Sequence, residues 1–145
     1  MKLNLFLPRI DHDRVVEAIR GAEARTSGEI RVVVARHKVE DPVKAAQAYF
    51  NKMGMAGSPH RNGVLVFVAP RSRRFAVIGD AAVHEKCGDA FWSGLAEAMA
   101  GHFRKGDFTE GIVHGIDRAG ELLAGAFPRT AGDASAGAPS VSEVD

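Results

Sequence analysis

The stretch GVLVFVAPRSRRFAVIG, residues 63–79, contains two apolar runs separated by a short basic turn. The first run, residues 63–69, is continuously apolar, which is typical of a strand covered on both faces of its sheet. The second run, Phe75–Gly79, has strand length and contains aromatic and β-branched residues. Because the turn at Pro70–Arg74 is too short for a crossover, the two strands are expected to pair antiparallel.

A third strand is predicted N-terminal to this hairpin, at the β-branched run Ile30–Ala35. Between it and the hairpin, a helix is expected to begin with Asp41 as its cap and Pro42 at its first position, and to end at Gly54. A strand–helix–strand unit almost always makes a right-handed crossover that places its two strands parallel. The expected sheet is therefore small and mixed.

Helical spacing of apolar residues marks the segments on either side of the strands. The first predicted helix begins at Asp11 and ends before Gly28. After the hairpin, a short helix is expected to follow Asp80 and to break at Gly88, and Asp89 then begins a longer helix.

The last predicted helix begins at Asp107, which has the spacing of a capping box with Glu110. The order α-β-α-β-β-α-α predicts an α/β fold, a three-layer α/β/α sandwich with a small mixed β-sheet. The segment Leu3–Leu7 is a candidate for an additional edge strand.

The composition is that of an ordinary globular domain: of 145 residues, 46% are hydrophobic and 26% charged. The formal net charge of +1 argues against a dedicated polyanion binder, so no specific nucleic acid is expected as a partner. Cys87 is the only cysteine, which excludes an internal disulfide and fits a reducing compartment. No apolar stretch approaches the roughly 20 residues that span a bilayer, and the N-terminus lacks a signal-peptide pattern. A cytoplasmic location is expected.

The composition changes at Arg129. Ten of the seventeen residues from 129 to 145 are Ala, Gly, Ser or Pro, and none is aromatic. Such a segment buries too little apolar surface to offset the entropy of ordering it. We therefore expect one folded domain over residues 1–128 and a disordered tail over residues 129–145.

The predicted topology brings polar residues together at one end of the sheet. Parallel strands start at the same end, and the antiparallel strand finishes there. Glu29, Arg61, Asn62 and Asp80 are therefore expected to converge, with the Gly54–His60 loop over them. Carboxylate and amide oxygens suit Ca²⁺ or Mg²⁺, and a guanidinium suits a phosphate or carboxylate.

Each of these residues also has an ordinary structural interpretation. Asp80 is placed where a helix needs an N-cap, and Asn62 precedes a glycine as in many turns. Glu29 could be a solvated strand end with Arg61 as its ion-pair partner. Only the expected convergence favours a functional site over these separate roles.

The opposite end of the sheet carries the basic turn. Arg71, Arg73 and Arg74 lie there, and charged hairpin tips often serve only to keep an edge soluble. The alternative is that these arginines bind a membrane protein or an anionic surface.

Short motifs follow one another in a fixed order between about Asp11 and Pro128: Ser27-Gly28-Glu29-Ile30, Arg61-Asn62-Gly63-Val64-Leu65, Ile78-Gly79-Asp80, Phe91-Trp92, Phe103, Gly106-x-Phe108-x-x-Gly111 and Leu123-Ala124-x-x-Phe127-Pro128. In these motifs the sequence resembles the TPM domain family, which comprises thylakoid-lumen photosystem-repair proteins and many bacterial relatives. The resemblance implies an α/β/α sandwich, divalent-cation binding and, as proposed for plant members, acid phosphatase activity. Many relatives carry an export signal and a membrane anchor. Neither pattern is recognised in this sequence, which therefore looks like the short cytoplasmic bacterial type.

Three functional hypotheses follow. The first is a weak site for a divalent cation, Ca²⁺ or Mg²⁺, with Glu29 and Asp80 as carboxylate ligands and the side-chain oxygen of Asn62 as a third. The second is a metal-assisted phosphatase at the same place, with Asp80 and Arg61 as candidate catalytic residues. The third is a non-enzymatic adaptor that uses the arginines of the basic turn.

Overall fold

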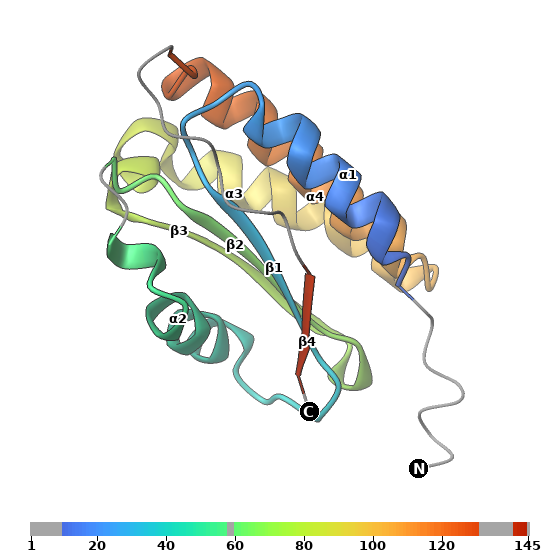
Figure 1. The fold of residues 1–145 in the computed structure, drawn as a ribbon. Coiled ribbons are helices and arrows are strands. Elements are labelled where there is room, and N and C mark those ends of the chain that lie inside the picture. Colours follow the sequence, from blue (N-terminus) through green and yellow to red (C-terminus); the bar gives the residue numbers. More distant parts are fainter. Residues whose placement is uncertain (1–9, 58–59, 131–140, 145) are drawn as a thin grey trace.

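The computed structural model describes residues 10–57, 60–130 and 141–144. Helices and strands follow the chain in the order α1 (His12–Glu23), β1 (Ile30–Ala35), α2 (Pro42–Lys52), β2 (Val64–Ala69), β3 (Arg74–Gly79), α3 (Ala81–Arg104), α4 (Phe108–Ala126) and β4 (Val141–Val144). The strands form one sheet between two layers of helices, which confirms the expected α/β/α sandwich (Figure 1).

The sheet is mixed and has the strand order β3-β2-β1-β4. Strands β1 and β2 pair parallel, with Ile30 opposite Val64 and Val34 opposite Val68. Strands β2 and β3 pair antiparallel, with Val64 opposite Gly79. Both pairings confirm the predicted crossover and hairpin.

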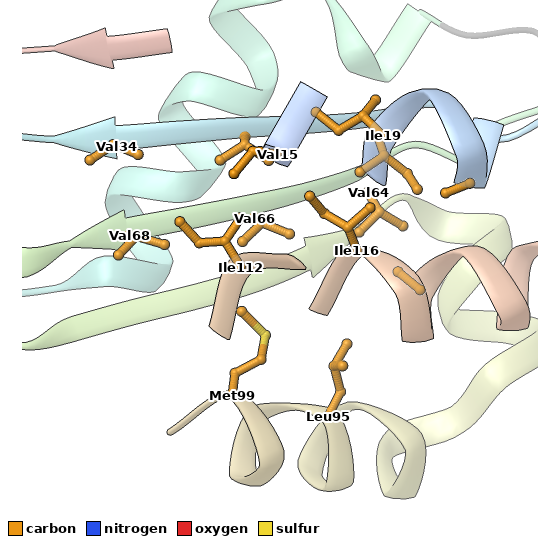
Figure 2. Close-up of a cluster of buried hydrophobic side chains, with 14 of the residues drawn as sticks. Val15, Ile19, Val34, Val64, Val66, Val68, Leu95, Met99, Ile112 and Ile116 are labelled. Carbon is orange, nitrogen blue, oxygen red and sulfur yellow. The ribbon is translucent and has the colours of Figure 1, made fainter. Parts of the chain in front are cut away.

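Side-chain alternation along the strands divides the core into two clusters. Val32 and Val34 point to the face covered by α1, α3 and α4, whereas Val33 and Ala35 point to the face covered by α2. Figure 2 shows the first cluster, where strand valines meet side chains such as Ile116 of α4. The sheet is thus buried on both faces, as the continuously apolar β2 predicted.

Most helix starts follow the predicted caps. The Asp11 side chain accepts a hydrogen bond from the Arg14 amide, and the Asp41 side chain accepts one from the Lys44 amide. The two helices expected after Asp80 form one element, α3, whose helical path is interrupted at Gly88 by φ 71° and ψ 169°.

The capping box at the start of α4 is not formed. Asp107 makes no side-chain cap hydrogen bond. Glu110 instead forms an ion pair with Arg14 of α1. A cation on a neighbouring helix therefore takes the carboxylate that the capping box would have used.

The expectation of a disordered tail is wrong for residues 141–144, which form β4 parallel to β1. The unpaired edge of β1 supplies the backbone partners that the composition of the tail does not reveal. Residues 131–140 and the candidate edge strand at Leu3–Leu7 lie outside the described residues. Within the part of the chain that the structure describes, no helix is long and apolar enough to cross a membrane.

Candidate functional site

The backbone of the predicted site residues meets at the end of the sheet where β1 and β2 begin. The Val64 amide donates to the Glu29 carbonyl over 2.8 Å, and the Asp80 amide donates to the Gly63 carbonyl over 2.9 Å. Glu29, Gly63 and Asp80 thus lie on three adjacent strand ends. Of the loop expected above them, residues 58 and 59 are outside the described chain.

Asp80 caps α3 and binds Arg61. Its Oδ1 accepts from the Ala81 amide at 2.7 Å, while Arg61 donates through Nε to Oδ2 and through Nη2 to Oδ1, both at 3.0 Å. Burial alone would raise the pKa of Asp80, but these hydrogen bonds and the Arg61 charge outweigh it and hold the pKa below its usual value. The carboxylate is 5% exposed and the Arg61 side chain 54% exposed. The pair therefore joins a buried anion to a guanidinium that reaches solvent.

Arg61 also has an unusual backbone. Its φ of 52° lies in the left-handed region, which is unfavourable for a side chain of this kind. Its carbonyl accepts a hydrogen bond from the Ala82 amide of α3. Contacts from the first turn of α3 thus hold Arg61 in place through both its side chain and its backbone.

Asn62 is buried, with 1% of its surface exposed. Its Nδ2 donates to Ser27 Oγ at 3.1 Å and so joins the segment before β2 to the segment before β1. A Cβ on the neighbouring Gly28 would lie 3.1 Å from the Asn62 carbonyl and 3.0 Å from Leu123. This close approach explains why residue 28 is a glycine. A role in a turn alone does not account for Asn62, because its buried side chain also bonds Ser27.

Glu29 pairs with Arg31, not with Arg61. The Arg31 Nη2 to Glu29 Oε2 distance is 2.9 Å, and both side chains are 30% exposed. Residues two apart on a strand share a face of the sheet, whereas Arg61 is held by Asp80. The alternative interpretation in which Arg61 is the ion-pair partner of Glu29 is therefore wrong.

A second buried carboxylate, Glu23, was not identified from the sequence. It is 6% exposed at the end of α1, and its Oε2 accepts a 2.8 Å hydrogen bond from the Ile30 amide. Burial, which outweighs this hydrogen bond, raises the pKa of Glu23. Glu23 lies in the last turn of an amphipathic helix, and nothing in the local sequence marks its side chain as buried.

Thr26 likewise fixes the segment before β1. The side chain is fully buried and donates to the Phe127 carbonyl at 2.5 Å, while it accepts from the Gly28 amide at 3.0 Å. The start of β1 is thereby tied to the end of α4.

The donor types at this end of the sheet are those that Ca²⁺ and Mg²⁺ prefer, namely carboxylate and amide oxygens. In the structure, Arg61 and Arg31 contact the two carboxylates of Asp80 and Glu29. The described residues contain no group of three or more His, Cys, Asp or Glu side chains arranged to hold a metal ion. The residue types therefore suit such a cation, but in the structure Arg31 neutralises the Glu29 carboxylate and Arg61 neutralises the Asp80 carboxylate.

The arginines of the basic turn lie at the other end of the sheet. Arg71 belongs to a single 3-10 turn, and Arg73 follows it with a left-handed φ of 53°. Arg73 and Arg74 are exposed, and Arg74 donates to the Glu40 carbonyl.

Comparison with known proteins gives a consistent picture. A family model described as the TPM domain matches residues 4–122. The solved structure of the BA42 protein from the psychrophilic bacterium Bizionia argentinensis is 32% identical, with a TM-score of 0.85, and the match covers 95% of this chain and 97% of that one. No curated protein matches the chain.

Two more distant structures share the fold. The N-terminal domain of the cg2496 protein from Corynebacterium glutamicum is 18% identical, with a TM-score of 0.60 and coverage of 77% of this chain and 70% of that one. An N-terminal domain of a P. gingivalis protein is 23% identical, with a TM-score of 0.61 and coverage of 78% and 71%.

Proposed function

The chain belongs to the TPM domain family, and on that premise we propose that it is a weak divalent-cation-binding domain. Its site is the end of the sheet where β1 and β2 begin. Glu29 and Asp80 supply carboxylate oxygens and Asn62 supplies its side-chain oxygen. The observation that carries this proposal is the backbone pairing that brings the starts of β1 and β2 beside the end of β3.

The hydrogen bonding of Asn62 supports its role as a ligand. Its amide nitrogen donates to Ser27, so its Oδ1 is the atom that a cation would use. Ca²⁺ takes six to eight oxygens, and three side chains leave the rest to backbone carbonyls and water. Such an incomplete protein ligand set gives a dissociation constant of about 10⁻⁴ M or weaker.

Arg61 competes with the cation in this proposal. Its guanidinium contacts both oxygens of Asp80, so a cation that uses Asp80 has to displace it. Two positive charges on one carboxylate repel each other strongly at a few ångströms. Removal of Arg61 should therefore strengthen cation binding, whereas removal of Asp80 should weaken it.

Calcium titration of the labelled protein by NMR tests this directly. We expect millimolar Ca²⁺ to shift the amides of Glu29, Asn62 and Asp80 first. Asp80→Asn should reduce the affinity and Arg61→Gln should raise it severalfold. Arg118→Gln, which removes the exposed pair with Glu121 elsewhere, is the matched control and should change nothing. An unchanged spectrum, or weaker binding by Arg61→Gln, contradicts the proposal.

One observation favours a second candidate, phosphatase chemistry at the same place. Arg61 is half-exposed and is held at one edge by Asp80, so its remaining N–H groups are available to a phosphate oxygen. Under this candidate Arg61→Gln weakens phosphate binding and slows hydrolysis of a generic phosphomonoester, the opposite sign from the cation site. Hydrolysis that persists unchanged in both Arg61→Gln and Asp80→Asn contradicts it.

The exposure of Arg73 and Arg74 favours a separate adaptor role at the basic turn. The joint replacement of Arg71, Arg73 and Arg74 by Ser should abolish sedimentation with phosphatidylserine vesicles or capture of a membrane protein. Capture that survives this replacement contradicts the role.

We also propose a cytoplasmic location, where a lone thiol stays reduced. Burial raises the pKa of Cys87, which keeps the thiol protonated.

A further inference from the structure

The C-terminal strand occupies the outer edge of the sheet. Residues 141–144 pair parallel with β1, from Val32 opposite Val141 to Ala35 opposite Val144. The Arg36 amide extends the pairing with a 2.7 Å hydrogen bond to the Val144 carbonyl. Without β4, the backbone groups on this side of β1 would form an open edge.

Side-chain contacts give this edge a sequence preference. Val141 packs against the cluster beneath α1, α3 and α4, and Val144 packs against the cluster beneath α2. Glu143 contacts two basic side chains, His12 of α1 and Arg36 at the end of β1. The edge therefore accepts the pattern apolar–polar–acidic–apolar in parallel orientation.

The contacts of β4 are those of a bound peptide. The strand has four residues, pairs with one strand among the described residues, and leaves each of its residues partly exposed. Short edge strands of this kind open at low free energy. The covalent link to the rest of the chain gives the segment an effective concentration in the millimolar range, so weak contacts suffice to keep it bound.

We propose that the outer edge of β1 is a docking edge for an extended acidic segment, and that residues 141–144 of this chain are its ligand, bound in cis and exchangeable with the same segment of a second copy. Backbone hydrogen bonds supply the binding, as in other cases of strand addition. The flanking valines and the basic pair His12 and Arg36 supply the specificity. The inference is independent of the proposed cation site.

A peptide in trans tests the proposal. The probe is the synthetic segment of residues 138–145, and the receptor is the full chain with Val141→Asp and Val144→Asp, which disable its own strand. We expect the peptide to shift the amides of residues 32–36 and to bind this variant at least about tenfold more tightly than the wild type, whose edge is occupied. Equal binding to both chains, or no binding to the variant, overturns the proposal.

Charge reversal tests the specificity. Arg36→Glu in the receptor should weaken binding of the natural peptide and favour a peptide with Glu143→Arg. A peptide with Ser142→Ala is the matched control and should bind like the natural one. Binding that is indifferent to Arg36→Glu overturns the assigned specificity. If the double valine variant does not fold, Glu143→Lys, at an exposed position, replaces it as the receptor with a weakened strand.

Discussion

Two buried carboxylates near the start of β1 respond to burial in opposite ways. Asp80 has a guanidinium and a helix N-terminus as partners, and these hold its pKa below the usual value despite burial. Glu23 accepts a hydrogen bond from the Ile30 amide, but burial outweighs this bond and its pKa is raised. The two residues should therefore give stability contributions with opposite pH dependence.

For Glu23, we expect Glu23→Gln to gain stability relative to the wild type as pH rises. The folded state binds the Glu23 proton more tightly than the unfolded state does, so the wild type loses stability as pH rises above the usual pKa of 4.5. Glutamine keeps an oxygen for the Ile30 amide and carries no charge. Urea midpoints at about pH 4 and about pH 7 measure the effect, and a difference between the proteins that does not change with pH contradicts it.

For Asp80, the pH dependence of the stability contribution has the opposite sign. Its folded-state pKa is lowered, so its contribution is present above the usual value of 3.8 and is lost as pH falls below it. Asp80→Asn keeps a good N-cap and removes the charge of the Arg61 pair, whereas Asp80→Ala removes both and should cost about 1 kcal/mol more at neutral pH. Urea unfolding measures both, with Glu121→Gln as an exposed-pair control. Equal stability of the Asn and Ala variants would contradict the capping role.

These residues show what local sequence determines. Asp11, Asp41 and Asp80 could be identified as caps because a cap and the amide it binds lie within a few positions. The role of Glu23 could not, because its donor belongs to another element and its burial depends on how α1 packs. The Arg61–Asp80 pair lies between these cases: topology predicted that the residues meet, but not that they bind each other.

At the scale of elements, α4 is the central helix of the layer that it forms with α1 and α3. It packs against both α1 and α3, and its glycines allow the close approach. A Cβ on Gly120 would lie 2.6 Å from the Ala22 Cβ and 3.2 Å from the Ala22 Cα of α1. A Cβ on Gly125, in the same helix, would meet nothing within 4 Å.

We therefore expect opposite effects of alanine at the two positions. Gly125→Ala should stabilise the protein by up to about 1 kcal/mol, because alanine is the better helix former. Gly120→Ala should destabilise it by about 1–3 kcal/mol, because the backbone of α1 has to shift. Thermal or urea unfolding of both variants measures this. A stabilising Gly120→Ala would show that α1 and α4 can separate without cost.

The strands differ in how well the sequence predicts them. Strands β1, β2 and β3 contain long β-branched or apolar runs, and the local sequence therefore specifies them. Val141–Val144 has two valines in a segment rich in Ala, Gly and Ser, and its contacts with His12 and Arg36 are more than 100 positions away. Strand β4 therefore depends on the completed edge of β1, which composition does not reveal.

At the scale of the whole molecule, the two faces of the sheet are covered unequally. On one face α4 packs against both α1 and α3, and all three helices contact the strands. Within the described residues, α2 is the only α-helix on the other face, where it packs on β2 and β3 (Figure 1). A helix without helical neighbours can detach while the rest of the fold persists.

We expect native-state hydrogen exchange to resolve this difference, with α2 amides opening at lower free energy than those of α4. Phe50→Ala removes a buried side chain of α2 and should lower the opening free energy of α2 by about 3–5 kcal/mol, up to the limit set by its own stability. The opening free energy of the α4 amides around Ile116 should stay unchanged, because these amides exchange only when the sheet itself opens. Val43→Ala, at a position that is 50% exposed on the same helix, is the control and should leave both unchanged. If α2 and α4 amides exchange with one common free energy and Phe50→Ala lowers both alike, the sheet couples its two faces into a single cooperative unit.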